Sequence, residues 1–462
     1  MKPMEKELLK KTLADYRAQK SAEPVPVKIR RAKLCDFSKR LAAAKMEIYA
    51  ALTADLNRNP METLLSELVA LMDISRYLAK NLPRLSRPRK LPGSMATFPA
   101  SAKLYREPFG RVLVISTWNY PLLLSLEPAL GAYAAGNRVV LKLSPRSQHT
   151  NIVVRKLVQS CFSSDEILVV AEELTFDEIL SYRYDYIFAT GNSGTGRKVM
   201  HHAAENLTPC TMELGGKNPC VVTAKANLHL AARRIVWGKF FNAGQSCAAP
   251  DYLLVDRAVK GKLMNLISAE IRRMYGEDPL SGKMLASMPD TGAYERILKL
   301  ISSGRLVCGG NHSPQHLSLE PTVVDQLADD SPLFSEEVFG PVLPVKEFAG
   351  DAELMQKLSA GNRPLAAYCF GASEELKNFF RYTFSCGAVI FDDVLIHFSN
   401  MNIPFGGVGT SGFGAYHGER SFTTFTHEKP VMTQSRFLDF PLRYPPYSRF
   451  LRRLVEFFSH LG

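Results

Sequence analysis

The chain lacks the features that would mark a zinc protein, a secreted protein or a membrane-spanning protein. Its eight cysteines include no CxxC pair and follow no regular spacing, which argues against a zinc site or a disulfide framework and fits a reducing compartment. The N-terminal MKPMEKELLKKTL is charged and predicts an amphipathic helix, because it has no uninterrupted apolar core of the secretory type. The most apolar stretch, 112–143, is interrupted by prolines, asparagines and charged residues. We therefore expect no transmembrane span and a cytoplasmic protein.

What the chain does have is the size and composition of a folded protein with several domains. At 462 residues it is too long for one compact core, and 46% hydrophobic with 22% charged residues is an ordinary globular composition. The net charge of +12 favours anionic partners in general. Because the basic residues are spread along the sequence and no nucleic-acid module is visible, we expect a solvated basic surface and no nucleic acid as a partner.

The order of apolar segments predicts an α/β fold. Residues up to about 92 follow the three- and four-residue spacing of helices, until the LPGS segment at 91–94 breaks the pattern. Strands are then predicted at 112–116, 138–144, 166–171 and 186–189, with helices at 126–136 and 151–162. This alternation indicates a parallel sheet with crossover helices, and a second strand–helix pattern follows at 210–405.

The stretch FFNAGQSCAAPDYLL, at 240–254, places a single cysteine, Cys247, among small residues ahead of a predicted strand. Small neighbours leave room for a substrate to reach the sulfur, and a thiol acts as a nucleophile only when it is accessible and ionisable. The alternative interpretation is a buried cysteine that merely packs.

A thiol that attacks a carbonyl group also needs a donor for the oxyanion and a base. The candidate donors are Asn119, in ISTWNYP, and Asn242. The candidate bases are Glu213, in MELGGK, and the pair Glu336 and Glu337, in EEVFGP. Each glutamate by itself could equally be a solvated charge, although two glycines after Glu213 minimise the backbone bulk there.

The histidines offer no comparable base. His201 and His202 are predicted on the surface of a helix, and the pattern does not place His397 or His417. A cysteine–glutamate arrangement is therefore favoured over a cysteine–histidine hydrolase.

Two glycine motifs resemble nucleotide-binding loops. GVGTSG at 407–412 has the spacing of a dinucleotide fingerprint, but too little chain follows it to build a βαβ unit. GNSGTGRK at 191–198 ends in Arg197 and Lys198 where a phosphate loop has Lys and Ser or Thr, which argues against a nucleoside triphosphate. It still joins a predicted strand to a predicted helix whose first N–H groups can bind a diphosphate. The plain alternative is a strand-to-helix turn.

Taken together, these segments resemble the aldehyde dehydrogenase superfamily, most closely its class 3 branch. The motifs that carry the resemblance stand in the family's order and span nearly the whole chain: TWNYP (117–121), AAGNRVVLK (134–142), TGNSGTG (190–196), MELGGKNP (212–219), FNAGQSCAAPDY (241–252), EEVFGP (336–341) and PFGGVGTSGFGAYHGERSF (404–422).

The resemblance implies an aldehyde dehydrogenase-like α/β fold with two parallel-sheet domains and a small β bridging or oligomerisation element, to which strands at 104–106 and after Phe422 would belong. The expected divisions are an NAD(P)-binding domain at 1–92 and 107–209, a catalytic domain at 210–405, the bridging element at 93–106 and 406–440, and an amphipathic tail at 441–462. A homodimer is also implied.

The resemblance further implies roles for individual residues. Cys247 would be the nucleophile, accessible and partly ionised beside the bound cofactor. Asn119 and the backbone N–H of Cys247 would stabilise the oxyanion, and Glu213 would activate water. Tyr120 would line the substrate entrance. The cofactor, NAD or NADP, would be held by Trp118, Lys142, Gly191, Asn192, Gly196, Glu337 and Phe339, with no metal ion.

The implied reaction is NAD(P)-dependent oxidation of medium- or long-chain aliphatic or aromatic aldehydes to carboxylic acids, through a thiohemiacetal and a thioester. One alternative is an acylating dehydrogenase that passes the thioester to coenzyme A, which Glu213 argues against. Another is a catalytically silent homologue used for binding or structure, which the intact site residues disfavour.

The sequence departs from the family pattern in two places. Pro145 stands where class 3 relatives usually carry a glutamate that would repel a 2′-phosphate, and Arg146 follows it. We therefore expect use of both NAD and NADP; the alternative is that Arg146 faces solvent.

The second departure is the C-terminal SRFLRRLVEFFSHLG. Apolar residues there share one helical face, against arginines at 449, 452 and 453; they are Phe450, Leu454, Phe457, Phe458 and Leu461. This predicts either an interfacial helix with peripheral membrane contact or packing against protein.

Overall fold

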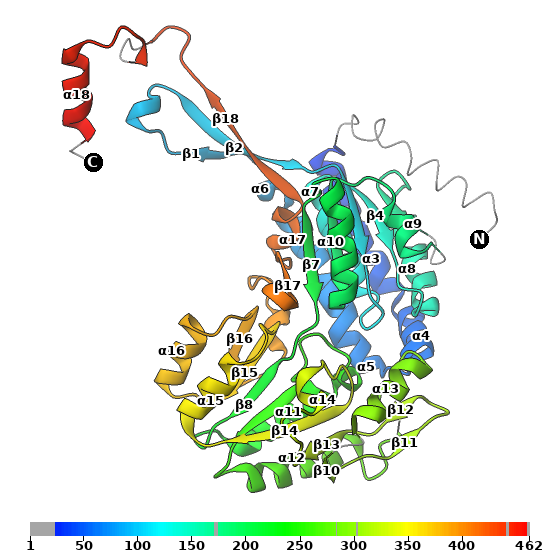
Figure 1. Cartoon of the computed structure of the whole chain (residues 1–462). Coiled ribbons are helices and arrows are strands. Elements are labelled where there is room, and N and C mark those ends of the chain that lie inside the picture. The colour runs from blue at the N-terminus through cyan, green and yellow to red at the C-terminus, as the bar shows by residue number, and fades with distance from the viewer. Residues whose placement is uncertain (1–23, 171–173, 283, 302–303, 440–442, 460–462) are drawn as a thin grey trace. The chain divides into compact units, whose positions relative to one another are not determined.

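The computed structural model describes residues 24–170, 174–282, 284–301, 304–439 and 443–459. The chain divides into two compact units (Figure 1). The larger unit comprises Met1–Leu85 and Pro108–Thr426, and the smaller comprises Ser86–Glu107 and His427–Gly462. The helix predicted for the first thirteen residues lies outside the described residues, so it stays a prediction.

The first sheet of the larger unit confirms the strands predicted in the first half of the chain. Its six strands have the order β17-β7-β6-β3-β4-β5, and all are parallel except β17. They are β3 (Arg111–Ile115), β4 (Arg138–Lys142), β5 (Ile167–Val169), β6 (Tyr186–Gly191), β7 (Cys210–Leu214) and β17 (Gly412–Phe413).

Helices cover this sheet and supply the N-terminal part of the unit, as the helical spacing predicts. They are α3 (Val27–Ala43), α4 (Lys45–Leu56), α5 (Pro60–Thr63), α6 (Val69–Leu85), α7 (Leu123–Ala135), α8 (Gln148–Cys161), α9 (Phe176–Leu180), α10 (Ser193–Glu205) and α17 (Arg420–Thr423). A π-helical turn, Leu64–Leu68, joins α5 to α6.

Strand β3 illustrates why the sheet is buried on both faces. All five of its residues are buried, and alternate side chains point into different cores. Val112 and Val114 pack into the core that contains α3, α6 and α7, whereas Leu113 and Ile115 pack into the core beside α10. A continuous apolar run is what a doubly covered parallel strand requires.

The second sheet confirms the later strand–helix pattern. Its seven strands have the order β10-β13-β14-β9-β8-β15-β16, with β10 antiparallel to its neighbour. The strands are β8 (Pro219–Val222), β9 (Tyr252–Asp256), β10 (Arg305–Cys308), β13 (Thr322–Asp325), β14 (Val342–Phe348), β15 (Ala366–Phe370) and β16 (Ala388–Phe391). The helices around it are α11 (Leu228–Phe240), α12 (Lys260–Tyr275), α13 (Thr291–Ile301), α14 (Pro332–Ser335), α15 (Gly350–Ser359) and α16 (Glu374–Tyr382). A short hairpin, β11 (His312–Ser313) with β12 (Ser318–Leu319), lies outside this sheet.

The smaller unit contains the strands expected for a bridging element. They form a three-stranded sheet in the order β1 (Arg89–Leu91), β2 (Ser101–Pro108) and β18 (Thr426–Thr433). The division into cofactor-binding, catalytic and bridging domains stays a prediction, because it concerns functions that the architecture does not test.

The C-terminal helix α18 (Arg449–Ser459) carries exposed apolar residues, Phe450, Val455 and Phe457. Leu461 lies outside the described residues, and the surroundings of Leu454 and Phe458 are not described. Among the helices of the described residues, none combines the length and the apolar character that crossing a membrane requires.

Candidate active site

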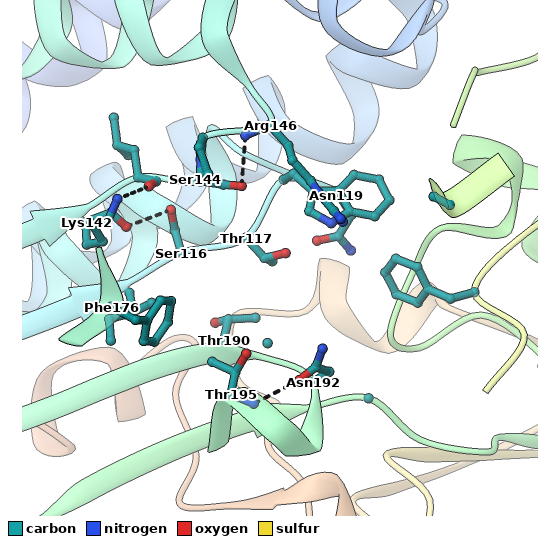
Figure 2. A pocket seen from close by; sticks show the side chains of 18 of the residues that line it. Ser116, Thr117, Asn119, Lys142, Ser144, Arg146, Phe176, Thr190, Asn192 and Thr195 are labelled. Carbon is teal, nitrogen blue, oxygen red and sulfur yellow. Dashed lines mark hydrogen bonds between the residues drawn. The ribbon is translucent and has the colours of Figure 1, made fainter. Parts of the chain in front are cut away.

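A cavity of about 830 Å³ lies where strands of the first sheet end, within the larger unit (Figure 2). The segments that follow β3, β4 and β6 form one wall, as expected for the carboxyl edge of a parallel sheet. Eight of the predicted site residues line it: Trp118, Asn119, Lys142, Gly191, Asn192, Cys247, Glu337 and Phe339. Gly196, Glu213 and Tyr120 are not among the lining residues.

The start of helix α10 forms one side of the cavity. Asn192 caps this helix: its side-chain oxygen accepts a 2.9 Å hydrogen bond from the backbone N–H of Thr195. A β-carbon at Gly191 would lie 3.0 Å from the Thr195 side chain, so glycine keeps this turn narrow. Gly196 instead packs against Leu214, since a β-carbon there would lie 3.1 Å from it. The unpaired N–H groups of the first helical turn suit an anion such as a diphosphate.

Basic side chains come from the end of β4 and from the segment that follows it, and Figure 2 labels both Lys142 and Arg146. Lys142 is buried, and its ammonium group donates to the carbonyl of Leu143 at 3.4 Å. Arg146 lines the cavity, but it does not simply face solvent: it pairs with Asp290 at 2.8 Å and its guanidinium lies 5.9 Å from the centre of the Trp118 ring.

Glu337 and Phe339 also line the cavity. Glu337 accepts a hydrogen bond from the N–H of Gly216 at 3.2 Å, and burial, followed by the charge of Asp251, raises its pKa to about 8. A β-carbon at Gly215 would lie 2.0 Å from a Glu337 oxygen, so only glycine leaves room for this carboxylate. The rings of Phe339 and Trp118 meet edge to face, 5.6 Å apart. Of the two glutamates in EEVFGP, Glu336 is exposed and only Glu337 reaches the cavity.

The thiol of Cys247 opens into the same cavity but is surrounded by groups that oppose its ionisation. The residue is partly buried and is one of the lining residues. Burial, then the charges of Glu337 and Glu213, raises the pKa of the Cys247 thiol to about 12, against smaller opposing effects of the N–H groups of Cys247 and Ala248. Desolvation and two carboxylates thus oppose ionisation more strongly than those N–H donors favour it, and the partly ionised thiol expected beside a bound cofactor stays a prediction.

Glu213 lies on β7 and is not among the residues that line this cavity. It is buried, and neither carboxylate oxygen has a hydrogen-bond partner among the described residues. Burial, followed by the charge of Glu127, raises the pKa of Glu213 well above its usual range. Its own charge in turn affects Cys247, so the two groups belong to one electrostatic site.

The oxyanion candidates behave differently from each other. Asn119 reaches the cavity, and its amide nitrogen donates to the carbonyl of Gln245 at 3.1 Å. Asn242 is wrong as a donor to substrate: it is fully buried, and its amide nitrogen donates to the carbonyls of Asn119 and Gln245 instead. Tyr120 is also buried, beneath the guanidinium of Arg58 at 5.0 Å from the ring centre, so its role at the substrate entrance stays a prediction.

The structure places two residues at this site that the sequence did not point to. Arg58 and Glu67 are completely buried and form an ion pair under the loop that carries Asn119. Arg58 stands in DLNRNP, a polar stretch typical of a solvated helix end, and no pattern in it signals burial.

The histidines are now placed. His201 is exposed and His202 is partly exposed on α10, as predicted. His417 is buried, and its Nδ1 lies 2.9 Å from a carboxylate oxygen of Glu127, the residue whose charge affects Glu213. His397 is buried as well, and desolvation lowers its pKa to about 4.

Comparisons with known proteins agree on one family. The sequence model of the "Aldehyde dehydrogenase family" matches residues 5–431. The chain is 39% identical to Aldehyde dehydrogenase family 3 member H1 of Arabidopsis thaliana, over 89% of this chain and 86% of that protein. It is 33% identical to 4,4′-diaponeurosporen-aldehyde dehydrogenase of Staphylococcus aureus, over 94% of this chain and 95% of that protein. The solved structure titled "Substrate bound state of Staphylococcus Aureus AldH" superposes with a TM-score of 0.92 at 32% identity, covering 99% of this chain and all of that one.

Proposed function

Because the chain belongs to the aldehyde dehydrogenase family, we propose that it oxidises medium- or long-chain aliphatic or aromatic aldehydes to carboxylic acids with NAD or NADP, and that water accepts the acyl group. One observation carries the proposal: the Cys247 thiol shares a cavity with Asn119, Lys142 and Glu337. The name of the Staphylococcus aureus relative supports an aldehyde as the substrate.

The residues around the cavity fit a nicotinamide dinucleotide. Gly191 and Gly215 leave spaces that a β-carbon would fill, and the start of α10 and Lys142 offer N–H groups and a cation to a diphosphate and its ribose. The carboxylate of Glu337 can accept hydrogen bonds from ribose hydroxyls, and Trp118 and Phe339 provide aromatic walls. When bound, an oxidised nicotinamide supplies an acceptor for hydride.

The chain's own residues account for the remaining steps. The Cys247 thiol loses its proton to solvent, and the thiolate sulfur attacks the aldehyde carbon to form a C–S bond. The carbonyl π pair moves to the oxygen, and the amide of Asn119 and the N–H of Cys247 stabilise the resulting oxyanion. Loss of hydride from that carbon leaves a thioester on Cys247. Glu213 then removes a proton from water, the resulting hydroxide attacks the thioester carbon, and the C–S bond breaks to release the carboxylic acid and the thiol.

The test is the production of reduced cofactor from a panel of aldehydes, with and without coenzyme A. We expect turnover without coenzyme A, and we expect Cys247→Ala to abolish it while the cofactor still binds. The matched control is Cys35→Ala, which removes an exposed thiol and should leave turnover unchanged. Turnover in Cys247→Ala would exclude the thiol mechanism, an absolute need for coenzyme A would favour the acylating alternative, and inactivity of the wild type on every aldehyde would favour a silent homologue.

Glu213→Gln separates the two halves of the reaction. We expect a burst of reduced cofactor to persist while steady-state turnover falls, because hydride loss precedes the step that needs the base. An unchanged burst and an unchanged steady state would remove Glu213 from this role.

For the cofactor, we propose that both NAD and NADP are used, since Pro145 presents no carboxylate to a 2′-phosphate and Arg146 offers a cation at the cavity. Asp290 competes for that cation at 2.8 Å, so Asp290→Asn should raise kcat/KM for NADP relative to NAD. A preference of the wild type for NAD above about a hundredfold would contradict dual use.

We also propose a cytoplasmic homodimer with peripheral membrane contact through residues 448–462. The exposed Phe450 and Phe457 support an interfacial helix. Flotation with anionic liposomes, for the full chain and for a chain ending at residue 447, distinguishes membrane contact from packing against protein, and sedimentation measures the oligomeric state.

A further inference from the structure

Arg58 makes contacts that a purely structural arginine would not need. It lies two positions after the end of α4, following the C-cap residue Asn57 with its left-handed φ of 48°, and no part of it is exposed. Each of its three nitrogens has its own acceptor: Nε donates to the side-chain oxygen of Asn242 at 2.9 Å, Nη1 to Glu67 and Nη2 to the backbone carbonyl of Asn119. One planar guanidinium therefore touches the loop of the proposed oxyanion donor and the loop that leads to the nucleophile.

The two loops are also bonded directly to each other above Arg58. The amide nitrogen of Asn242 donates to the carbonyl of Asn119 at 3.0 Å, and the side chain of Asn119 donates to the carbonyl of Gln245 at 3.1 Å. Gln245 precedes Cys247 by two positions. These hydrogen bonds set the direction of the Asn119 side chain relative to the sulfur. Arg58 holds both bonded partners, because it donates to the Asn242 side chain and to the Asn119 carbonyl.

Glu67 fixes the far end of the same loop. Its second carboxylate oxygen accepts hydrogen bonds from the N–H groups of Leu122 and Leu123 at 2.7 and 3.0 Å. Burial raises the pKa of Glu67, and the charge of Arg58 opposes that effect. A buried ion pair is a costly way to gain stability, because apolar residues of similar volume often serve as well. The Arg58–Glu67 pair makes directed hydrogen bonds to both loops, and an apolar pair could not make them.

The loop before Cys247 has an unfavourable backbone conformation that needs stabilising contacts. Asn242 and Ala243 have φ of 53° and 52°, a left-handed conformation that side chains other than glycine disfavour. Asn242 is held there through its side chain by Arg58 and through its N–H by Glu62, at 3.2 Å. Loss of these contacts would let the loop relax away from Asn119.

We infer that Arg58 is a positioning residue that aligns the Asn119 amide with the Cys247 sulfur, an inference that rests on the proposed function through the role of Asn119. Arg58 is fully buried and is not among the residues that line the cavity. Lysine in its place keeps the charge but cannot serve three acceptors in one plane, so Arg58→Lys isolates geometry from charge.

The experiment is a double-mutant cycle between Arg58→Lys and Asn119→Ala, with Arg76→Lys as the control, since Arg76 is an exposed arginine of the same helical region. The readouts are kcat/KM for aldehyde oxidation, the rate of Cys247-dependent cleavage of p-nitrophenyl acetate without cofactor, the rate of Cys247 alkylation by iodoacetamide, and cofactor affinity. The ester reaction needs the thiol and the oxyanion donor but no hydride transfer, whereas alkylation develops no oxyanion.

We expect Asn119→Ala to lower ester cleavage and aldehyde oxidation by about 10²–10³-fold, the range for loss of one oxyanion donor. Arg58→Lys should lower both by about tenfold or more while alkylation and cofactor affinity stay within about threefold, and the double variant should be no slower than Asn119→Ala alone. Losses that multiply in the double variant, or equal losses in all readouts, would overturn the inference.

If Arg58→Lys does not fold, Asn242→Ala takes its place in the cycle, because it cuts the link between the loops and leaves the Arg58–Glu67 pair intact. We expect the Asn242→Ala/Asn119→Ala double variant to be no slower than Asn119→Ala alone. Losses that multiply, or equal losses in all readouts, would again overturn the inference. If aldehyde oxidation is absent but Cys247-dependent ester cleavage shows the coupling, the proposed function fails and the inference stands. If Cys247 performs no chemistry at all, both fail.

Discussion

The ionisation of Cys247 is the property that the structure predicts most sharply. With a thiol pKa of about 12 in the protein without cofactor, the thiolate fraction at pH 8 is about 10⁻⁴, against about 0.2 for a free thiol of pKa about 8.5. A thiolate of higher pKa is intrinsically more nucleophilic, which recovers about one to two orders of magnitude. Alkylation of Cys247 by iodoacetamide should therefore be about 10²-fold slower than that of free cysteine at pH 8.

The pH dependence of the alkylation rate gives a second prediction. Glu337, with a pKa of about 8, gains its charge within the range of the experiment, and that charge raises the pKa of the Cys247 thiol. The rate of alkylation should therefore rise less than tenfold per pH unit around pH 8 in the wild type. Removing the charge in Glu337→Gln should give a higher rate above pH 8 and restore the full tenfold slope per unit, to within about a factor of two.

The assay follows the peptide that contains Cys247 by mass spectrometry, from about pH 7 to about pH 10 in the absence of NAD and NADP. Glu336→Gln is the matched control, since that neighbouring carboxylate is exposed and should not change the curve. A rate that reaches a plateau below pH 8, and keeps it in Glu337→Gln, would show a thiol already ionised by the protein and refute this reasoning.

Three further changes test the surroundings of the site. Glu127→Gln removes a charge that raises the pKa of Glu213, so the acid limb of thioester hydrolysis should move to lower pH. An unmoved midpoint in the pH profile of the steady-state rate after the burst would contradict this. Gly412→Ala places a β-carbon 1.9 Å from a carbonyl of the neighbouring strand at a φ of 121°, so it should lower the free energy of unfolding by about 1–3 kcal/mol in urea titrations and reduce activity by displacing Glu213, its partner in register. Gly215→Ala would press on the Glu337 carboxylate at 2.0 Å, so it should weaken cofactor binding in a fluorescence titration, and an unchanged affinity would contradict this.

The fold was predictable where apolar residues follow a pattern typical of a strand or a helix. The apolar runs at 112–116 and 138–144 became β3 and β4 because strands covered on both faces need apolar side chains on both. The glycine turn at 191–196 was predictable for the same local reason, since one residue, Asn192, both ends a strand segment and caps a helix. Signals of this kind depend on neighbours in the sequence.

The features of the site that the sequence did not predict depend on residues that are close in space but distant in the sequence. Arg58 and Asn119 are 61 positions apart and touch only because the helical segment packs beneath the loop after β3. Asn242 looked equivalent to Asn119, as an asparagine near the nucleophile. The left-handed backbone at Asn242 directs its side chain into the protein instead of the cavity. No residue type in FFNAGQSC predicts that left-handed conformation.

Glu213 accepts no hydrogen bond from the residues that the structure describes, and this supports its proposed role as a base. A carboxylate that accepts several hydrogen bonds has a low pKa and is a weak base, whereas burial without such bonds raises the pKa and strengthens the base once it is ionised. Within the described residues, nearby Glu127 has the opposite environment, since one of its oxygens meets His417 at 2.9 Å and Ser421 at 3.2 Å. The hydrogen-bonding partners of these two carboxylates thus go to Glu127, and Glu213, which we propose as the base for water, is left without them among the described residues. An engineered hydrogen bond to Glu213 should therefore slow thioester hydrolysis even if every other contact of the site is kept.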